Sequence, residues 1–119
     1  MDTRFQRDLM RGSLDLMVLS VLAEQKQYGY SIQKRLRAVS GNMVRLQAGT
    51  LYPLLHRLEA GGAIRSRWDE KEGRRRKWYT LTTKGRKQLH KQAGQWRKYV
   101  QCISALLPQH WSGASAASE

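Results

Sequence analysis

Apolar residues recur at helical spacing in four stretches of the chain, and the pattern changes to strand-like alternation between the third and fourth stretches. The first, residues 13–25, has apolar side chains on more than one face, which is typical of a buried helix; Ser13 and Asp15 suit its N-terminus. The second, residues 31–39, follows a KQYG loop and ends at Gly41 or Asn42, which tolerate the left-handed conformation that closes helices. Its inward positions are Ile32, Leu36 and Val39.

The third helix is predicted from Gly49 or Thr50 to Gly61-Gly62, with Pro53 in its first turn, where a missing N–H is tolerated. At about 100° per residue this helix divides into two faces. The leucine face consists of Leu51, Leu54, Leu55 and Leu58. The opposite face carries Thr50, Tyr52, Pro53, His56, Arg57 and Ala60.

Two strands are predicted next, at residues 63–68 and 77–82, and a charged hairpin tip over residues 69–76 joins them. We expect Trp68 and Trp78 to form a packing pair across the two strands. Residues 43–46 are a candidate for a small extra strand.

The hairpin tip contains the basic run Arg74, Arg75, Arg76 and Lys77. These side chains point to both faces if the run lies in a strand, and they fan outward if it lies in a turn. Asp69, Glu70 and Glu72 lie across the hairpin and neutralise part of this charge. One role for the run is a solvated gatekeeper that protects a sheet edge. We favour contact with phosphates, each of which adds about 0.9 to the negative salt slope of binding.

The last helix is predicted over residues 83–108, and Pro108 stops it. Its apolar residues recur as a heptad seam: Leu89, Ala93, Trp96, Val100, Ile103 and Leu107. Such a seam packs either on its own domain or on a second copy of the chain, and we favour a two-fold homodimer. Trp96 lies in the middle of the seam, where it either fills the dimer core or contacts a flat aromatic ligand.

The composition of the chain limits the classes of partner that it is expected to bind. The 119 residues include 22 Lys and Arg against nine Asp and Glu, a formal net charge of +13. Nucleic acid is the commonest partner of a small basic domain, and an anionic membrane surface is the other candidate. The chain has no apolar run of about 18 residues that could span a bilayer, and its first residues lack the apolar core of a signal peptide, so we expect a cytoplasmic protein.

Enzymatic and metal-binding classes receive no support from the motifs. His56, His90 and His110 are scattered without metal-ligand spacing, and no phosphate-binding glycine loop or nucleophile elbow is present. We expect no cofactor. The single cysteine, Cys102, excludes an internal disulfide, and we expect a buried, inert thiol in preference to a redox sensor.

Three segments together resemble the PadR family of bacterial transcription regulators: YGYSIQKRL, GTLYPLLHRLEAGGAIRSRW and GRRRKWYTLTTKGRKQL. The opening GSLDLMVLSVLAEQKQYGY fits as well, so the resemblance covers about residues 9–107. It implies a winged helix-turn-helix homodimer, usually a repressor, of the short subfamily with a single C-terminal helix. It also implies that Tyr28 and Tyr30 frame the start of the second helix, and that a planar aromatic effector at the dimer centre is a candidate ligand of Trp96.

The predicted fold is therefore mainly α with a small β-hairpin. It comprises an N-terminal arm (1–12), a winged helix-turn-helix DNA-binding domain (13–82), a C-terminal dimerisation helix (83–108) and a disordered tail (109–119). We expect a regulator that binds a palindromic operator in double-stranded DNA. One alternative is a winged-helix module without an effector, acting architecturally or on RNA, and another is an adaptor whose wing or terminal helix binds a protein partner. The predicted DNA contacts are Tyr30, Lys34, Thr50, Tyr52, Pro53, His56, Arg57, Arg74, Arg75, Arg76 and Lys77.

Overall fold

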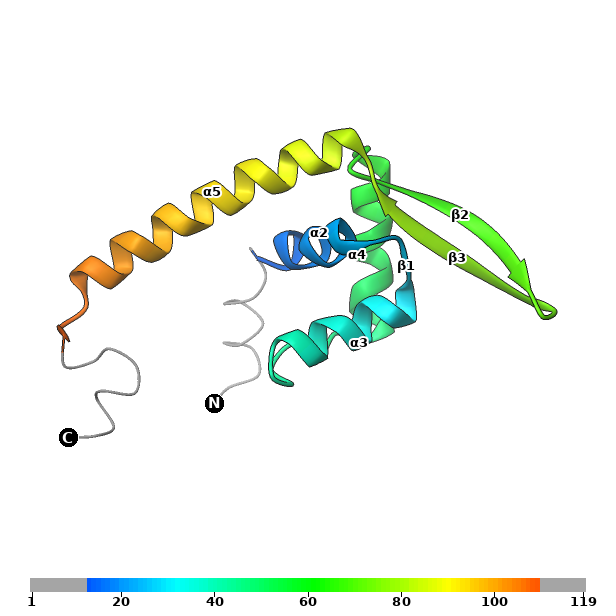
Figure 1. The fold of residues 1–119 in the computed structure, drawn as a ribbon, viewed down its shortest axis with the longest axis horizontal. Helices are drawn as coiled ribbons and strands as arrows, with labels where there is room; N and C mark the ends of the chain where they lie inside the picture. Colours follow the sequence, from blue (N-terminus) through cyan, green and yellow to red (C-terminus); the bar gives the residue numbers. More distant parts are fainter. Residues whose placement is uncertain (1–12, 110–119) are drawn as a thin grey trace. The chain divides into compact units, whose positions relative to one another are not determined.

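The computed structural model describes residues 13–109, which form four helices and a three-stranded antiparallel sheet (Figure 1). The predictions for residues 1–12 and 110–119 lie outside this range. The described elements are α2 (Leu14–Glu24), β1 (Gln27–Tyr28), α3 (Gly29–Val39), α4 (Ala48–Ala60), β2 (Ile64–Lys71), β3 (Arg74–Leu81) and α5 (Thr83–Leu106). They fall into two units, with the boundary between Leu89 and His90 inside α5.

The core of the first unit is built from one face of each helix and the base of the sheet. The leucine face of α4 is buried as predicted, and it packs with apolar residues of α2, α3 and the strands. The fully buried large side chains are Val18, Leu19, Leu22, Ile32, Leu51, Leu55 and Ile64. Burial of these side chains is the main term that stabilises the unit.

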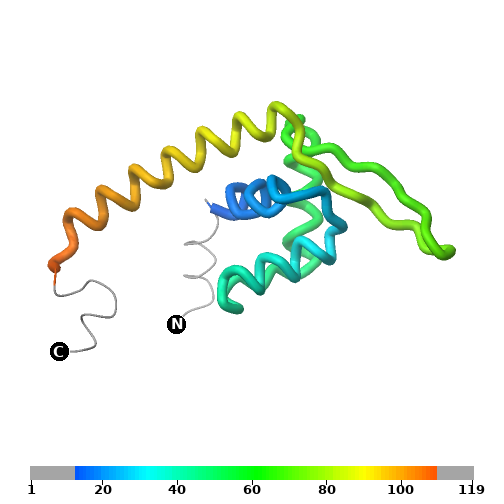
Figure 2. The backbone as a smooth tube through the Cα atoms, viewed as in Figure 1, coloured from blue at the N-terminus to red at the C-terminus, as the bar shows by residue number. Residues whose placement is uncertain are grey.

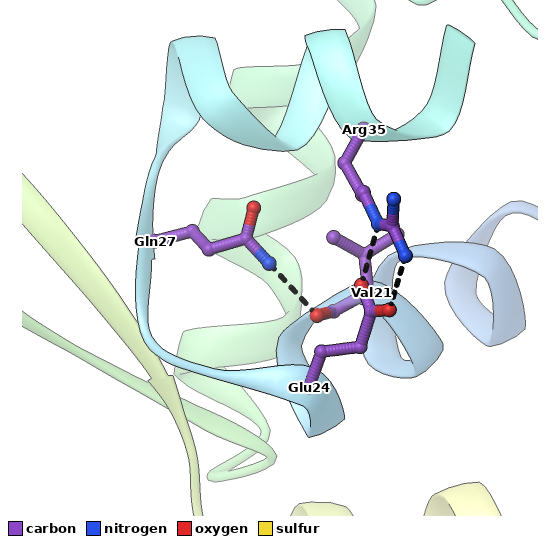
Figure 3. A network of polar contacts seen from close by, with 4 residues as sticks. All are labelled: Val21, Glu24, Gln27 and Arg35. Carbon is purple, nitrogen blue, oxygen red and sulfur yellow. Dashed lines mark hydrogen bonds and ion pairs between the residues drawn. The ribbon is translucent and has the colours of Figure 1, made fainter. Parts of the chain in front are cut away.

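The corner between α2 and α3 is fixed by polar contacts (Figure 3). The buried Gln27 side chain donates a hydrogen bond of 2.9 Å to the Val21 carbonyl, one of the carbonyls in the last turn of α2. Arg35 of α3 donates to both carboxylate oxygens of Glu24, at 2.9 and 2.7 Å. Ser13 occupies the N-cap position of α2, although its side chain makes no capping hydrogen bond.

The short extra strand lies at residues 27–28, within the KQYG segment, and residues 43–46, which were a candidate for such a strand, do not form one. Gln27 and Tyr28 pair with Tyr79 and Trp78 of β3. The backbone of residues 43–46 is held by a side chain of α3 instead of by a neighbouring strand: Gln33 donates a hydrogen bond of 2.8 Å to the Leu46 carbonyl.

Helix α3 begins at Gly29, two residues before its predicted start, and ends at Val39 as predicted. Ile32 and Leu36 are buried, but Val39 is 65% exposed, so its inward assignment was wrong. The row of core-facing residues on α3 therefore ends at Leu36, before the helix itself ends. The next residue of the chain that belongs to the core is Leu46, in the segment that follows the helix. Gly41 and Asn42 close the helix with positive φ angles of 64° and 72°, as predicted.

The hairpin of β2 and β3 is longer than predicted, and we call it the wing (Figure 2). Its strands run from Ile64 to Lys71 and from Arg74 to Leu81, so the predicted eight-residue tip is a two-residue turn. Glu72 and Gly73 both have positive φ, 55° and 75°, which is the geometry of a tight hairpin turn. The run of charges over residues 69–76 lacks apolar alternation, so the pattern did not reveal these strand residues.

Trp68 and Trp78 do not form the predicted pair. The register places Trp68 opposite Lys77 and Trp78 opposite Arg67. Since opposed residues share a face and neighbours along a strand lie on opposite faces, the two indoles lie on opposite sides of the wing.

Helix α4 begins at Ala48, slightly earlier than predicted, so Pro53 lies in its second turn and not its first. Helix α5 is preceded by Thr82, whose hydroxyl accepts a hydrogen bond from the Gly85 N–H at 3.0 Å. The same hydroxyl donates to the Gly62 carbonyl at 2.6 Å, which ties the start of α5 to the base of the wing.

The second unit contains the remainder of α5. Cys102 is exposed, so the expected burial of this thiol was wrong; position 102 lies beside the heptad seam and not on it. Leu107 follows the last residue of α5, although its N–H still bonds to the Ile103 carbonyl at 3.0 Å. None of the helices within residues 13–109 is long and apolar enough to cross a membrane.

Candidate nucleic-acid interface

The outer face of α4 exposes polar side chains, as its division into two faces predicted. Thr50, Tyr52, Pro53 and His56 are all exposed, while the four leucines of the helix face the core. Arg57 is exposed too, but it forms a 2.6 Å ion pair with Asp15 of α2 and is thereby directed toward that helix.

A hollow of about 760 Å³ lies between the first turn of α3, the outer face of α4 and β3. It brings together Tyr30, Tyr52, His56 and the basic run of the wing, which the sequence had predicted to act at one site. Lys34, Thr50, Pro53 and Arg57 do not line it. The complete lining is Tyr28, Gly29, Tyr30, Ser31, Tyr52, His56, Trp68, Arg74, Arg75, Arg76, Lys77 and Tyr79.

Gly29 explains how Tyr52 reaches the start of α3. A Cβ atom at position 29 would lie 2.5 Å from the Tyr52 hydroxyl and 2.9 Å from two of its ring carbons. Only glycine leaves room for this phenol against the first turn of the helix. The first turn of α3 and Tyr52 thus line the same wall of the hollow.

The cations of the wing lie in a strand and alternate between its faces, which is the arrangement expected of a strand and not the outward fan expected of a turn. On the inner wing face, defined by Trp68, Arg75, Lys77 and Tyr79, the indole of Trp68 carries two cations. The Arg75 guanidinium lies 4.2 Å from the ring centroid and the Lys77 ammonium 5.2 Å from it. Cation–π attraction holds both charges near the hollow.

The other side of the wing is joined to β1 by a cluster of Tyr28, Trp78 and Asp69, which we call the wing lock. The Tyr28 and Trp78 rings lie 3.8 Å apart between centroids, at an angle of 30°. Asp69 Oδ2 accepts hydrogen bonds from Trp78 Nε1 at 2.8 Å and from the Tyr28 hydroxyl at 3.3 Å. Arg76 lies 5.0 Å from the Tyr28 ring centroid.

These contacts shift two pKa values in opposite directions. The hydrogen bond from Trp78, followed by the one from Tyr28, lowers the pKa of Asp69. Burial and the neighbouring Asp69 charge raise the pKa of Tyr28. Asp69 is therefore ionised and Tyr28 protonated at neutral pH, which is the state that the hydrogen bonds of the wing lock require.

Two residues that line the hollow, Tyr28 and Trp68, were missing from the predicted DNA contacts, although both make well-defined contacts in the structure. Trp68 could be assigned to the hollow only from the strand register, and the register depends on the length of the turn at Glu72 and Gly73. Tyr28 enters through β1, a strand too short for a sequence pattern to indicate. Within residues 13–109, no group of three or more His, Cys, Asp or Glu side chains is placed to hold a metal ion.

The heptad seam of α5 is mostly exposed in the single chain. Leu89, its first residue, packs against the core of the first unit. Farther along, in the second unit, Trp96 is 47% exposed and its ring lies 5.7 Å from that of Tyr99, measured between centroids. The other exposed seam residues are Val100, Ile103 and Leu107.

Comparison with known proteins places these features in a family context. Residues 18–91 match the family described as transcriptional regulator PadR-like. A transcriptional regulator from Clostridium thermocellum is 32% identical, with a TM-score of 0.78, over 85% of this chain and 99% of that one. Transcriptional regulator Rv3488 of Mycobacterium tuberculosis is 36% identical over 83 residues, 70% of this chain and 75% of its own.

One similar structure contains a nucleic acid. Bacillus subtilis PadR, crystallised in complex with operator DNA, is 27% identical with a TM-score of 0.62. The similarity covers 67% of this chain and 46% of that larger one.

Proposed function

The chain belongs to the PadR-like family of transcriptional regulators, and we propose that it acts as a homodimer that binds a palindromic operator and represses transcription. The observation that carries this proposal is the hollow between α3, α4 and the wing. It combines exposed hydrogen-bonding side chains of one helix with a run of cations in one strand. The DNA complex of the similar Bacillus subtilis PadR supports the same class of ligand.

In the proposed complex α4 is the recognition helix. Thr50, Tyr52 and His56 lie on its exposed face, where hydroxyl and imidazole groups can bond to base edges or phosphates. The wing cations and the first turn of α3 hold the sugar–phosphate backbone, because phosphate contacts fix register while base contacts specify sequence.

Dimerisation follows from the exposed seam of α5. A row of large apolar side chains from Trp96 to Leu107 is a surface that water solvates poorly and that a second copy of the helix can cover. A rigid dimer would present two α4 helices to half-sites about 34–36 Å apart.

Operator selection tests the DNA-binding proposal. Duplexes selected from a random pool should contain an inverted repeat, and nuclease footprinting should give a bounded, palindromic protected site. Uniform weak protection of every sequence would instead indicate an architectural or RNA-binding module. His56→Ala should weaken binding of the selected site by roughly 5- to 150-fold, the cost of losing about 1–3 kcal/mol of base contact. His90→Ala, an exposed histidine on α5, is the matched control and should bind like the wild type.

We further propose that a planar aromatic effector binds at Trp96 and shifts the dimer to a geometry with weaker operator affinity. The half-exposed Trp96 ring and its neighbour Tyr99 support this site. Trp96→Ala should leave operator affinity within a few-fold of the wild type and lower the affinity for planar aromatic dyes, measured by dye fluorescence. Equal dye affinity in the variant would remove the effector from this site.

A further inference from the structure

We infer that Glu59 is a positioning residue for DNA recognition, which holds the wing at the angle to α4 that the operator requires. Glu59 lies on α4, but it does not line the hollow and was not among the predicted DNA contacts. The inference rests on the proposed function and deepens it, because it identifies a residue that acts through its neighbours without touching the DNA.

One carboxylate oxygen of Glu59 accepts two hydrogen bonds from a single residue of β2. Glu59 Oε2 lies 3.0 Å from the backbone nitrogen of Ser66 and 2.6 Å from its hydroxyl oxygen. Both side chains are partly buried, which strengthens the hydrogen bonds by limiting the access of water. Hydrogen bonds to a carboxylate are roughly twice as strong as those between neutral groups. This Glu59–Ser66 pair therefore joins α4 firmly to the base of the wing.

The pair fixes the direction in which the wing leaves the core. The turn after α4 is closed by a backbone hydrogen bond of 2.9 Å from Ala63 to the Leu58 carbonyl, and Ile64 then anchors the start of β2 in the core. Ser66 lies on the same face of the strand as Ile64, because alternate residues share a face. Two anchors along one strand define its direction, whereas Ile64 alone would leave the strand free to pivot.

The pair lies next to residues that line the hollow. Ser66 is opposite Tyr79 in the strand register, and burial, with the charge of Glu59 as a further cause, raises the pKa of Tyr79. The hydrogen bond from the Ser66 hydroxyl lowers the pKa of Glu59, and the nearby Lys77 and His56 act in the same direction. Glu59 is therefore ionised at neutral pH, the state in which it accepts both hydrogen bonds.

A carboxylate so close to Lys77 and His56 has two opposite effects on the proposed DNA binding. Its negative charge repels phosphates, and this weakens binding to every sequence alike. Its hydrogen bonds to Ser66 favour the operator alone, because base contacts specify sequence only when α4 and the wing meet the duplex together. Loss of the charge and loss of the hydrogen bonds should thus change different quantities.

Two substitutions at position 59 separate these effects. Glu59→Gln removes the charge but keeps an oxygen that accepts from Ser66, whereas Glu59→Ala removes both. The measured quantity is the Kd for a duplex of unrelated sequence divided by the Kd for the selected operator, at one salt concentration. Glu59→Gln should keep this specificity ratio within about three-fold of the wild type, and Glu59→Ala should lower it roughly 10-fold, the effect of one lost hydrogen bond to a charged group. A smaller folded fraction would scale both Kd values equally and leave the ratio unchanged.

Ser66→Ala tests the other side of the pair by removing the hydroxyl donor. It should lower the specificity ratio as well, and Glu59→Ala/Ser66→Ala should lower it no further than Glu59→Ala, because both changes break one contact. Glu24→Ala is the matched control: it removes a carboxylate that pairs with Arg35 at 2.7 Å, outside the hollow, and should keep the wild-type ratio. Circular dichroism and thermal melting check the fold, and Ser66→Ala decides the test if Glu59→Ala does not fold.

A wild-type specificity ratio in Glu59→Ala or in Ser66→Ala would overturn the inference. An equal loss in Glu59→Gln and Glu59→Ala would overturn it too, because the effect would then belong to the charge and not to the hydrogen bonds. None of these results would touch the proposed function, which fails if the wild type selects no sequence from the random pool.

Discussion

Asp69 is a carboxylate among the cations of the wing, and its hydrogen bonds decide its role. From the sequence it counts only as partial neutralisation of the basic run. In the structure it joins β2 to β3 and β1, because it accepts from Trp78 and Tyr28 together. The residue types alone could not predict this, since the contact depends on which face each strand residue occupies.

The ionisation of Asp69 can be followed through the indole N–H of Trp78, which donates a hydrogen bond to its carboxylate. Its lowered pKa means that its contribution to stability is complete above the ordinary value of 3.8 and is lost as the pH falls through the lower folded value. We predict that the indole N–H resonance of Trp78 titrates with a midpoint below 3.8, measured by ¹H–¹⁵N NMR. Tyr28→Phe removes one hydrogen bond and should raise the midpoint, whereas Tyr30→Phe should not. A midpoint that Tyr28→Phe leaves unchanged would exclude Tyr28 from the wing lock.

Gly85 is a residue whose need for glycine is steric. It is buried at the start of α5, where a Cβ would overlap the carbonyl oxygen of Ala63. Backbone atoms cannot move aside as a flexible side chain can, so Gly85→Ala should destabilise the protein by about 3 kcal/mol, at the upper end of overpacking costs. Urea denaturation followed by circular dichroism measures this. Gly49→Ala in α4 is the control, since no atom lies within 4 Å of its added Cβ, and it should not lower stability.

At the scale of the elements, the sequence predicted best where side-chain burial alone sets the structure. The leucine face of α4 and the positive φ angles at Gly41 and Asn42 are confirmed. The pattern failed where pairing between distant segments decides the outcome. Strand β1 exists because Gln27 and Tyr28 pair with Tyr79 and Trp78, which lie 52 and 50 residues later in the chain. The wing strands were predicted too short because charged residues carry no alternation of polar and apolar positions.

The wing turn gives the prediction at this scale. Glu72 occupies the first position of a two-residue turn with a φ of 55°, a conformation that asparagine and glycine adopt at lower cost than glutamate. Glu72→Asn should therefore stabilise the protein by roughly 0.5–1 kcal/mol. Chemical denaturation provides the measurement. Glu70→Asn, two residues earlier and within β2, should not stabilise the protein, because asparagine is disfavoured in strands. Equal effects of the two changes would assign the gain to lost charge and not to the turn.

At the scale of the whole molecule, the net charge of +13 predicts an anionic partner but not where it binds. The strand register divides the wing cations between the two faces of the hairpin, and the site that we propose for the partner includes the cations that line the hollow. Under the dimerisation that we propose for the exposed seam of α5, a single chain is an incomplete binding unit. An isolated module of this size contacts few base pairs, and two joined modules gain affinity by holding both half-sites at once.

A substitution that disrupts the seam should abolish dimerisation while each winged-helix unit still binds its DNA half-site. Ile103→Asp places a charge on the exposed seam, where burial against a second helix would leave it unpaired at a high cost. We predict a monomer by analytical ultracentrifugation, with affinity for a full palindrome reduced at least 100-fold and affinity for a single half-site unchanged. Gln101→Asp adds the same charge to an exposed position beside the seam and should remain dimeric. If Ile103→Asp sediments like the wild type, the seam of α5 does not hold the dimer together. If it is monomeric and also loses half-site binding, α5 supports the winged-helix unit itself and not only its pairing.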